Sequence, residues 1–270
     1  MEHNNSKDFK RLFFGAEVAA PWPDKLPAAH LLPIEVRHIT LSFLGNIAYS
    51  KLQPLLKEIP VPAFKIEPAA WCDKIVFLPP DSPRVIATNV KWFTKDEPLL
   101  SYQKDLAVWL DSHQFKLDKR EFFPHVTLAR APFRAEDWEN AIETLPLQIK
   151  AIHLYESLGN LTYVPLWSHH FHPAFTEIDH TADIAFTIYG SSVQQLHLNA
   201  KIALAFKFPR LLNYFGSTLH DSLDDIIIDL NCLIAQADAA IGCPFKAVSF
   251  HGNIIEEASM LLKWEMIVDV

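Results

Sequence analysis

The chain has 270 residues and a formal net charge of −8, which favours one large domain or two modest ones. Half of the residues are hydrophobic, enough for a packed core, yet no apolar run approaches the length of a membrane span. The charge balance also excludes a broad basic platform of the kind that binds long nucleic-acid duplexes.

Composition changes along the chain near Pro173. Up to that proline, 19 Lys and Arg face 20 Asp and Glu, and 17 of the 19 prolines lie there. From Ala174 onward, 5 basic residues face 12 acidic ones. We therefore predict two domains, residues 1–172 and residues 173–270.

The first eight residues are polar and show no apolar stretch after a basic one, so no signal peptide is expected. The three cysteines, Cys72, Cys232 and Cys243, are scattered and fit neither a disulfide framework nor a thiolate metal site. Together these features predict a cytoplasmic protein with no membrane partner.

Periodicity over the first 172 residues predicts a mixed α+β order. Strands are expected at 11–18, 36–44, within 64–78, and at 84–90, 121–130, 149–158 and 161–165. Helices are expected at 51–58 with Ser50 as the N-cap, at 97–113 and at 136–145. The first His-bearing strand is expected to stop at Gly45 and Asn46.

Two of these strands carry the same His-x-Thr pattern. With period two, His38 and Thr40 share one face of the first strand, as His125 and Thr127 do in the second. Ser42 is expected on the His38 face, with Phe43 turned to the core. Arg130 falls on the face opposite His125 and is therefore expected to be structural or peripheral.

Chance alone predicts about 0.5 copies of His-x-Thr in a chain of this composition, so one copy means little. The pattern is also compatible with two structural histidines on half-exposed strands. If the strands face each other, however, they offer two proton carriers and two hydroxyl donors to a small anion. An imidazole and an imidazolium coexist near neutral pH and can act as base and acid.

The flanks of the two segments resemble the 2H phosphoesterases, and within them the RNA 2′,3′-cyclic phosphodiesterases once described as 2′-5′ RNA ligases. The resemblance lies in Thr-Leu-Ser-Phe-Leu-Gly after His38 and in Phe-Phe-Pro before and Thr-Leu-Ala-Arg after His125, and covers about residues 8–165. It implies a bilobal α+β fold with antiparallel sheets and no metal. His38 would then be the acid, His125 the base, and Thr40 and Thr127 phosphate ligands, giving a 2′-phosphate.

The segment His169-His170-Phe171-His172 lies near the predicted boundary. A solvated connector is the preferred interpretation, with a metal-binding tract as the alternative.

The second half predicts a strand at 184–190, a helix from the capping box at Ser192 to about Phe206, and a final strand at 263–270. The stretch 223–241 is periodic enough for a helix, although Ile226-Ile227-Ile228 leaves a strand open. In the final strand, four apolar residues are expected on one face: Trp264, Met266, Val268 and Val270.

Three segments of this half resemble archease, a small protein that assists the RNA ligase of tRNA splicing and RNA repair. They are residues 179–183 (Asp-His-Thr-Ala-Asp), residues 246–251 (Lys-Ala-Val-Ser-Phe-His) and Asp269. The resemblance implies a divalent-cation site, expected to hold calcium, formed by Asp183, Asp269 and Val270, with Lys246 as a functional residue. The stretch before Lys246 is shorter than in archease, and solvated surface acids are the plainer alternative.

These resemblances predict a bifunctional protein that acts on RNA ends bearing a 2′,3′-cyclic phosphate, with an RNA ligase as a further partner. The alternative is a non-enzymatic accessory protein that binds RNA phosphate ends and docks on a ligase.

Overall fold

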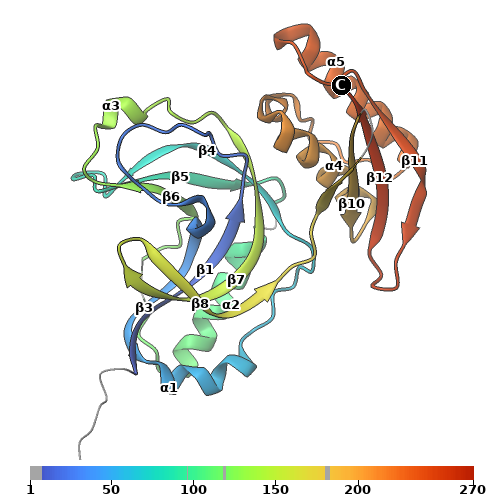
Figure 1. Ribbon diagram of the computed structural model, residues 1–270. Coiled ribbons are helices and arrows are strands. Elements are labelled where there is room, and N and C mark those ends of the chain that lie inside the picture. The colour runs from blue at the N-terminus through green and yellow to red at the C-terminus, as the bar shows by residue number, and fades with distance from the viewer. Residues whose placement is uncertain (1–7, 96, 118–119, 180–182) are drawn as a thin grey trace, which may run out of the picture.

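The computed structural model describes residues 8–95, 97–117, 120–179 and 183–270, whose strands form two antiparallel sheets (Figure 1). The larger sheet has eight strands, and the smaller has four that begin at Phe175. Separate hydrophobic clusters lie against the two sheets. A mixed fold with antiparallel sheets is therefore confirmed. Among the described residues, no helix is long and apolar enough to cross a membrane.

The larger sheet follows the order β1-β3-β6-β5-β4-β7-β8, and β1 also pairs with β7, which closes the path into a ring. The short strand β2 pairs with β6. The bounds are β1 Phe9–Ala19, β2 His30–Leu31, β3 His38–Ala48, β4 Ala69–Leu78, β5 Val85–Trp92, β6 His125–Arg130, β7 Leu145–Gly159 and β8 Thr162–His170.

Two halves make up this ring. Strands β1, β3, β7 and β8 form one half, and β2, β4, β5 and β6 form the other (Figure 1). They join where Ile39 of β3 pairs with Val126 of β6, and where Ala69–Cys72 pairs with Leu145–Gln148. Each half therefore supplies one His-x-Thr segment, and the two segments meet at the first junction.

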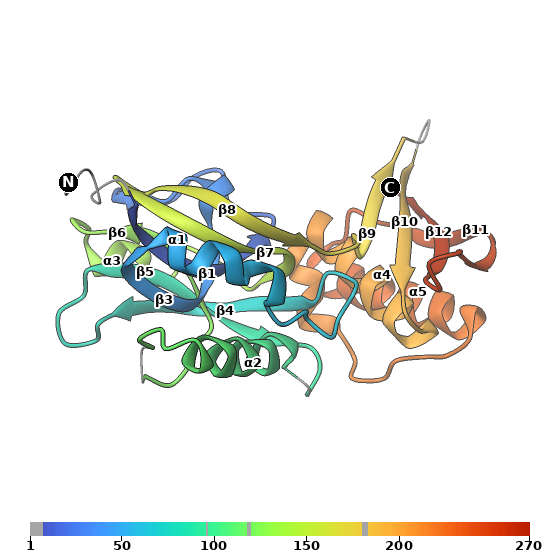
Figure 2. The same ribbon diagram turned by 90° about the horizontal axis from the view of Figure 1, so that it is seen from below.

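The helix predicted at 97–113 is confirmed as α2 (Pro98–Ser112). Its buried stripe contains Leu99, Leu106 and Leu110. Figure 2 shows the helix α2 running along the underside of the larger sheet. An amphipathic helix is expected to bury such a stripe against a neighbouring layer.

Two other predicted helices of this half are shorter than expected. At 51–58, α1 (Tyr49–Leu52) gives way to a 3-10 helix over Gln53–Glu58. Ser50 lies inside α1 rather than at its N-cap, because its hydroxyl donates to Asp8 Oδ2 at 2.6 Å. At 136–145, α3 spans Ala135–Trp138, since Leu145 already pairs in the sheet as the first residue of β7.

Strand ends also differ from the sequence pattern. β3 continues past Gly45 to Ala48, because Gly45 adopts a φ of +73° that accommodates a β-bulge against Leu12. β8 extends to His170, so His169 and His170 belong to a strand, and His172 forms a bridge with Ile66. The interpretation of this His-rich segment as a solvated connector is therefore wrong.

The smaller sheet has the order β11-β12-β10-β9. Its elements are β9 Phe175–Ile178, β10 Ile184–Gly190, α4 Val193–Lys207, a 3-10 helix Pro209–Tyr214, α5 Leu223–Ile241, β11 Ala247–Glu256 and β12 Leu262–Asp269. The cap is confirmed, since Ser192 Oγ accepts from Gln195 N at 3.2 Å. The stretch 223–241 is helical, and Trp264, Met266 and Val268 are buried as predicted, whereas Val270 is exposed.

Several contacts join the part of the chain that contains β1–β8, called here the N-terminal unit, to the part from β9 onward, the C-terminal unit. Arg210 forms an ion pair with Glu143 at 3.0 Å, and the rings of Phe93 and Phe215 lie 5.9 Å apart. Figure 2 shows the two units at opposite ends of an elongated molecule. That residues 1–172 and residues 173–270 are separate domains, each able to fold without the other, stays a prediction.

Candidate active site

The two His-x-Thr segments lie side by side on neighbouring strands. Their middle residues, Ile39 and Val126, form a cross-strand pair, and both side chains are fully buried in the core of the N-terminal unit. Because side chains alternate along a strand, the His and Thr of each segment project from the opposite face.

The register places unlike groups opposite each other. In an antiparallel ladder that contains the Ile39–Val126 pair, His38 faces Thr127 and Thr40 faces His125. Directly opposite residues have Cβ atoms about 4.5–5.5 Å apart. The two imidazoles therefore occupy diagonal corners of one small patch, with a hydroxyl beside each.

Each imidazole is held by the same backbone contact. His38 Nδ1 lies 2.7 Å from the carbonyl oxygen of Val36, and His125 Nδ1 lies 2.8 Å from that of Phe123. A carbonyl oxygen only accepts, so Nδ1 must carry the proton in both rings. In the neutral tautomer Nε2 is then the unprotonated nitrogen, the one that can exchange a proton with a ligand.

The two imidazoles differ in burial. Burial lowers the pKa of His38 to about 4, against the opposing effect of its hydrogen bond to Val36. Burial also lowers the pKa of His125 below its usual value. At pH 7 the unliganded protein therefore holds both rings neutral, and one of them must gain a proton before it can act as an acid.

A β-bulge follows the Thr of each segment. Gly15 pairs with Thr40 and Phe14 with Ser42, so Leu41 is the extra residue in β3. Ala87 pairs with Thr127 and Ile86 with Ala129, so Leu128 is the extra residue in β6. A bulge shifts the alternation of side chains by one position.

The carbonyl groups of both bulge residues have hydrogen-bond partners. Gln103 Nε2 of α2 donates to the Leu41 carbonyl at 3.4 Å, and Leu32 N donates to the Leu128 carbonyl at 2.8 Å. Since unpaired buried backbone groups are costly, these contacts help to hold the bulges in place.

Because of the bulges, the side chains of Arg130 and Phe43 point in other directions than the sequence pattern predicts. Arg130, predicted on the face opposite His125, lines the same cavity as His38. Phe43, predicted to enter the core, lines that cavity and is 41 % exposed, whereas Ser42 is absent from its described lining. Strict period-two counting fails at both sites because one extra residue follows each Thr.

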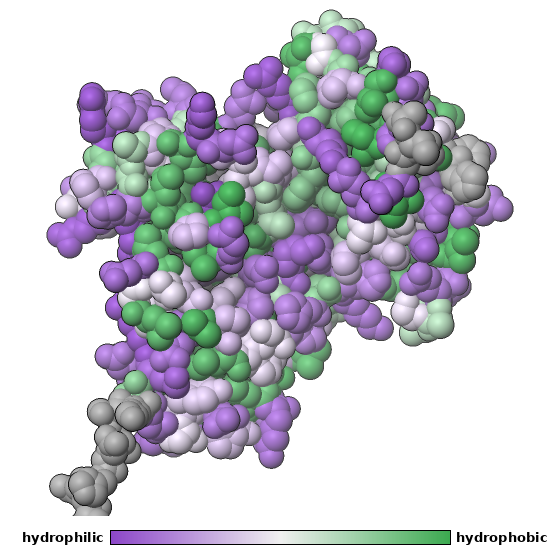
Figure 3. Space-filling view, viewed as in Figure 1, coloured by the Kyte–Doolittle hydropathy of each residue, from purple (hydrophilic) through white to green (hydrophobic). Residues whose placement is uncertain are grey.

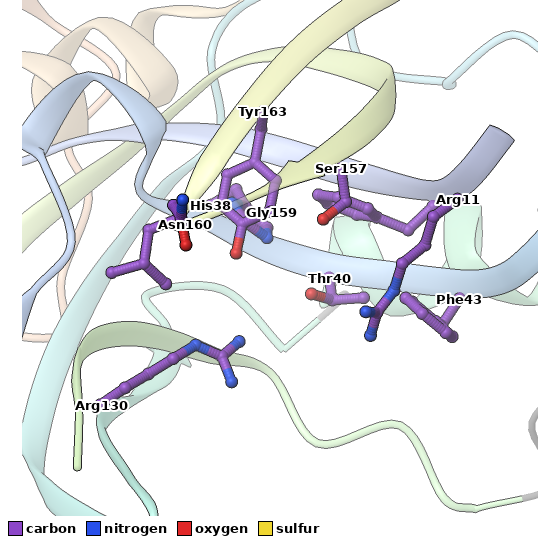
Figure 4. Close-up of a pocket in the computed structure, with 11 residues that line it drawn as sticks. Arg11, His38, Thr40, Phe43, Arg130, Ser157, Gly159, Asn160 and Tyr163 are labelled. Carbon is purple, nitrogen blue, oxygen red and sulfur yellow. The ribbon is translucent and has the colours of Figure 1, made fainter. Parts of the chain in front are cut away.

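A cavity of about 390 Å³ lies on the His-x-Thr face (Figure 4). Its described lining is Arg11, Phe13, His38, Thr40, Phe43, Arg130, Ser157, Gly159, Asn160, Leu161 and Tyr163. His38 and Thr40 thus belong to its wall, while His125 and Thr127 lie beside it on β6.

The lining of this cavity suits an anion. Figure 4 shows the guanidinium groups of Arg11 and Arg130 pointing toward the space around Thr40. Of the described residues that line the cavity, none is acidic. Planar guanidinium groups bind phosphate oxygens in a bidentate manner, and a hydroxyl adds a further hydrogen bond.

Aromatic rings surround the polar centre. Arg11 lies over the ring of Phe43 at 5.2 Å, and the exposed ring of Phe123 stacks on His125 at 5.5 Å between centroids. In the view of Figure 3, hydrophobic residues gather on part of the surface of the N-terminal unit and are bordered by hydrophilic ones. Exposed rings beside an anion site are suited to stack on nucleobases.

The predicted metal residues lie at one end of the smaller sheet. Asp183 directly precedes β10, whose first residue, Ile184, pairs with Val268, so Asp183 comes opposite Asp269. Lys246 Nζ donates to the main-chain oxygen of Val270 and lies 3.7 Å from Asp269 Oδ1. Residues 180–182 of the archease-like motif lie outside the described residues.

The described ligand candidates at this end of the smaller sheet are two carboxylates and a main-chain oxygen. Among the described residues, no group of three or more His, Cys, Asp or Glu side chains could hold a metal ion. Carboxylate and main-chain oxygens are hard donors that suit calcium or magnesium. The Lys246 ammonium, however, already supplies a positive charge there.

Comparison with curated proteins gives a relative of known activity. An RNA 2′,3′-cyclic phosphodiesterase from Geobacillus stearothermophilus is 34 % identical to this chain over 116 residues, which is 40 % of this chain and 35 % of that one. The chain is similar to a cyclic phosphodiesterase. It spans about a third of the length of that relative. No protein-family model matches the chain.

Solved structures that align with the chain include E. coli LigT in its apo form, with 18 % identity and a TM-score of 0.45 over 61 % of this chain and 98 % of that one. LigT complexed with 3′-AMP aligns with a TM-score of 0.43 and 18 % identity, covering 60 % and 98 % of the two chains. The protein TT0787 of Thermus thermophilus gives 0.44 and 18 %, covering 60 % and 97 %.

Sequence reasoning placed a turn between the strands expected at 149–158 and 161–165, but it missed that Arg11, Arg130, Asn160 and Leu161 line the cavity. The turn residues adopt φ values of +48° and +60°, unusual for residues other than glycine, and line the cavity at the end of the β7–β8 hairpin. The arginines could have been found by asking which basic residues flank the His strands, but their direction depends on bulges that no periodicity reveals.

Proposed function

We propose that this protein hydrolyses 2′,3′-cyclic phosphate ends of RNA, with the N-terminal unit as the catalytic part. The observation that carries the proposal is the pairing of the two His-x-Thr segments through Ile39 and Val126, with both imidazoles anchored through Nδ1. The similarity to an RNA 2′,3′-cyclic phosphodiesterase supports the same substrate class.

In this reaction, the Nε2 atom of one neutral imidazole removes a proton from water, which attacks the cyclic phosphorus. The protonated second imidazole gives its proton to the leaving ribose oxygen, and the ring of the cyclic phosphate opens. Thr40 and Thr127 donate hydrogen bonds to the non-bridging oxygens, and Arg11 and Arg130 stabilise the charge that develops on them. We assign the acid role to His38, the base role to His125, and a 2′-phosphate as the product.

Because the pKa of His38 is about 4 in the unliganded protein, the acid role requires a rise in that pKa on binding. A bound phosphate supplies it, since a nearby negative charge favours the imidazolium. Binding of the proposed substrate thus favours the protonated form of His38, the form that acts as the acid.

The test is turnover of 2′,3′-cyclic nucleotides and of a short RNA with a cyclic phosphate end. His38→Asn and His125→Asn should each lower the rate by about two to four powers of ten. His113→Asn, at the C-cap of α2 and outside the cavity lining, is the matched control and should keep full activity. Unchanged turnover in the double variant would exclude this chemistry.

A non-enzymatic role is the second candidate, in which the same patch binds RNA phosphate ends and the C-terminal unit docks on a ligase. It is supported by the same two arginines and by the motifs that resemble archease. Tight binding of a cyclic-phosphate RNA without any turnover would favour it over the hydrolase.

For the C-terminal unit we propose an archease-like contribution to RNA ligation in tRNA splicing or RNA repair, with a divalent cation, expected to be calcium, held by Asp183, Asp269 and Val270. The opposition of Asp183 and Asp269 across β10 and β12 supports this. Calcium should raise the melting temperature of the protein, and Asp269→Asn should abolish the shift. Glu256→Gln, on β11, is the control and should retain it.

A further inference from the structure

A second cavity, of about 450 Å³, lies between the two units. Its described lining is Trp71, Asp73, Phe93, Thr144, Leu198, Lys201, Leu212, Asn213, Phe215, Gly216, Ser217 and Leu219. None of these residues lines the candidate active site. Its volume falls within the range of small-molecule sites, which often lie between domains.

Aromatic rings from both units form one wall of this interunit cavity. Trp71 and Phe93, from the N-terminal unit, have ring centroids 4.7 Å apart, and Phe93 lies 5.9 Å from Phe215 of the C-terminal unit. Such a wall offers stacking surfaces to a planar ring.

A buried ammonium group lies beside the aromatic wall. Lys201 on α4 is 1 % exposed, and its Nζ lies 6.0 Å from the centroid of the Phe215 ring. Its Nζ forms an ion pair with Asp229 Oδ2 at 2.7 Å, which leaves further N–H groups of the ammonium without a described partner. A buried lysine with donors to spare is unusual, because an unmet hydrogen bond costs about 1–3 kcal/mol.

The surroundings fix this lysine and keep the cavity close to neutral. The buried His197 places Nε2 3.0 Å from the same Asp229 Oδ2, which holds the carboxylate in place. At the rim, Asp73 pairs with Lys91 at 2.7 Å. An uncharged ligand with a hydrogen-bond acceptor therefore fits better than an anion.

We propose that the interunit cavity binds a nucleobase, which stacks on Trp71, Phe93 and Phe215 and accepts a hydrogen bond from Lys201. Because Lys201 only donates, the base should present adjacent acceptors. Guanine offers O6 and N7 on one edge, whereas adenine places a donor beside N7. Guanine is therefore expected to bind more tightly than adenine.

The experiment is calorimetric titration of the full chain with guanosine and adenosine, and with a short RNA ending in a free 3′-hydroxyl. Saturable binding that is tighter for guanosine is the expected result. If the RNA binds more tightly than guanosine, the base belongs to an RNA strand, and if not, to a free nucleoside.

Two variants test the residues. Lys201→Met should weaken guanosine binding about tenfold or more, and Trp71→Leu should do the same without touching the Asp229 ion pair. Lys207→Met, an exposed lysine of the same helix, is the control and should bind normally. Melting curves of each variant show whether it is folded, and Trp71→Leu keeps the test valid if Lys201→Met is not.

Absence of saturable guanosine binding at millimolar concentration, or equal affinity in the wild type and both variants, would overturn the proposal. The proposal does not depend on the hydrolase activity, because guanosine contains no phosphodiester. His38→Asn should therefore lose turnover and keep guanosine binding, so that failure of either assay is distinguishable from failure of the other.

Discussion

His38 and His125 have the same backbone anchor but different burial, and this difference sets their protonation. With Nδ1 fixed as a donor in both rings, only Nε2 changes its state during a reaction. Catalysis by such a pair needs one ring charged and one neutral. Because burial lowers the pKa of His38, the unliganded protein has one charged and one neutral ring only at acidic pH.

The pH dependence should therefore differ between two kinetic constants. kcat/KM reports the unliganded protein, where the pKa of His38 is about 4 and that of His125 is also lowered, so its bell-shaped profile should peak below pH 6.5. Bound phosphate raises both pKa values, so the optimum of kcat should lie at higher pH. Initial rates across pH 4–9 test this; coincident optima at or above pH 7 would contradict it.

Arg130 is the residue for which the structure most changes the sequence-based view. Arg130→Ala should lower kcat/KM by about 10- to 100-fold, since a hydrogen bond to a charged group contributes about 1.5–3 kcal/mol. Arg130→Lys should restore only part of the loss, because an ammonium cannot bind two phosphate oxygens in a bidentate manner.

Arg134→Ala provides the comparison for Arg130. Arg134 is exposed and pairs with Glu136 at 3.2 Å outside the cavity, so its removal should leave the kinetics unchanged. Equal effects of the two substitutions would mean that Arg130 acts only through the general charge of the surface.

At the scale of an element, β1 closely supports the ring of His38. A Cβ atom added at Gly15 would lie 3.2 Å from Tyr155 Cε2, 3.3 Å from His38 Cδ2 and 3.3 Å from Phe13 Cε2. These contacts are tighter than normal packing, so a methyl group must push at least one ring aside.

Gly15→Ala is therefore expected to lower kcat/KM about tenfold, because small displacements of a catalytic group slow the reaction strongly. The measurement is the rate together with the melting temperature. Gly216→Ala, where an added Cβ meets nothing within 4 Å, should change neither. A normal rate in Gly15→Ala would show that His38 has room to move.

Sequence patterns predicted the elements that long periodic stretches specify. The stripe of α2, the strand β10, the alternation of β12 and the cap at Ser192 all formed as expected. Predicted bounds were wrong where pairing with a strand distant in the sequence ends a helix, as at 136–145, where Leu145 pairs with Cys72. The sequence identified the two His-x-Thr segments but left open whether their strands face each other, and the directions of Phe43 and Arg130 depend on bulges that only cross-strand register reveals.

At the scale of the whole molecule, the N-terminal unit has a complete core. Residues 1–172, expressed alone, should fold and keep most cyclic phosphodiesterase activity, because the described part of the cluster behind the His strands ends at Phe171. The fragment would expose Trp71 and Phe93, so reduced solubility is expected. Circular dichroism and turnover test it; a folded but inactive fragment would show that catalysis needs the C-terminal unit.

The repeated bulge has a consequence for regiochemistry. Two His-x-Thr segments with the same anchor and the same bulge form an almost two-fold symmetric site, which by itself would accept a cyclic phosphate in two opposite orientations. One orientation expels the 3′-oxygen and the other the 2′-oxygen. The third residue after each Thr breaks this symmetry, since it is Phe43 in one segment and Arg130 in the other.

In the proposed hydrolase, we expect the orientation of the ribose to depend on which of these two side chains lies on each side. Exchanging them in the double variant Phe43→Arg, Arg130→Phe should shift the product from the 2′-phosphate toward the 3′-phosphate, a ratio that phosphorus NMR resolves directly. An unchanged ratio in an active double variant would place the choice of leaving oxygen elsewhere in the site.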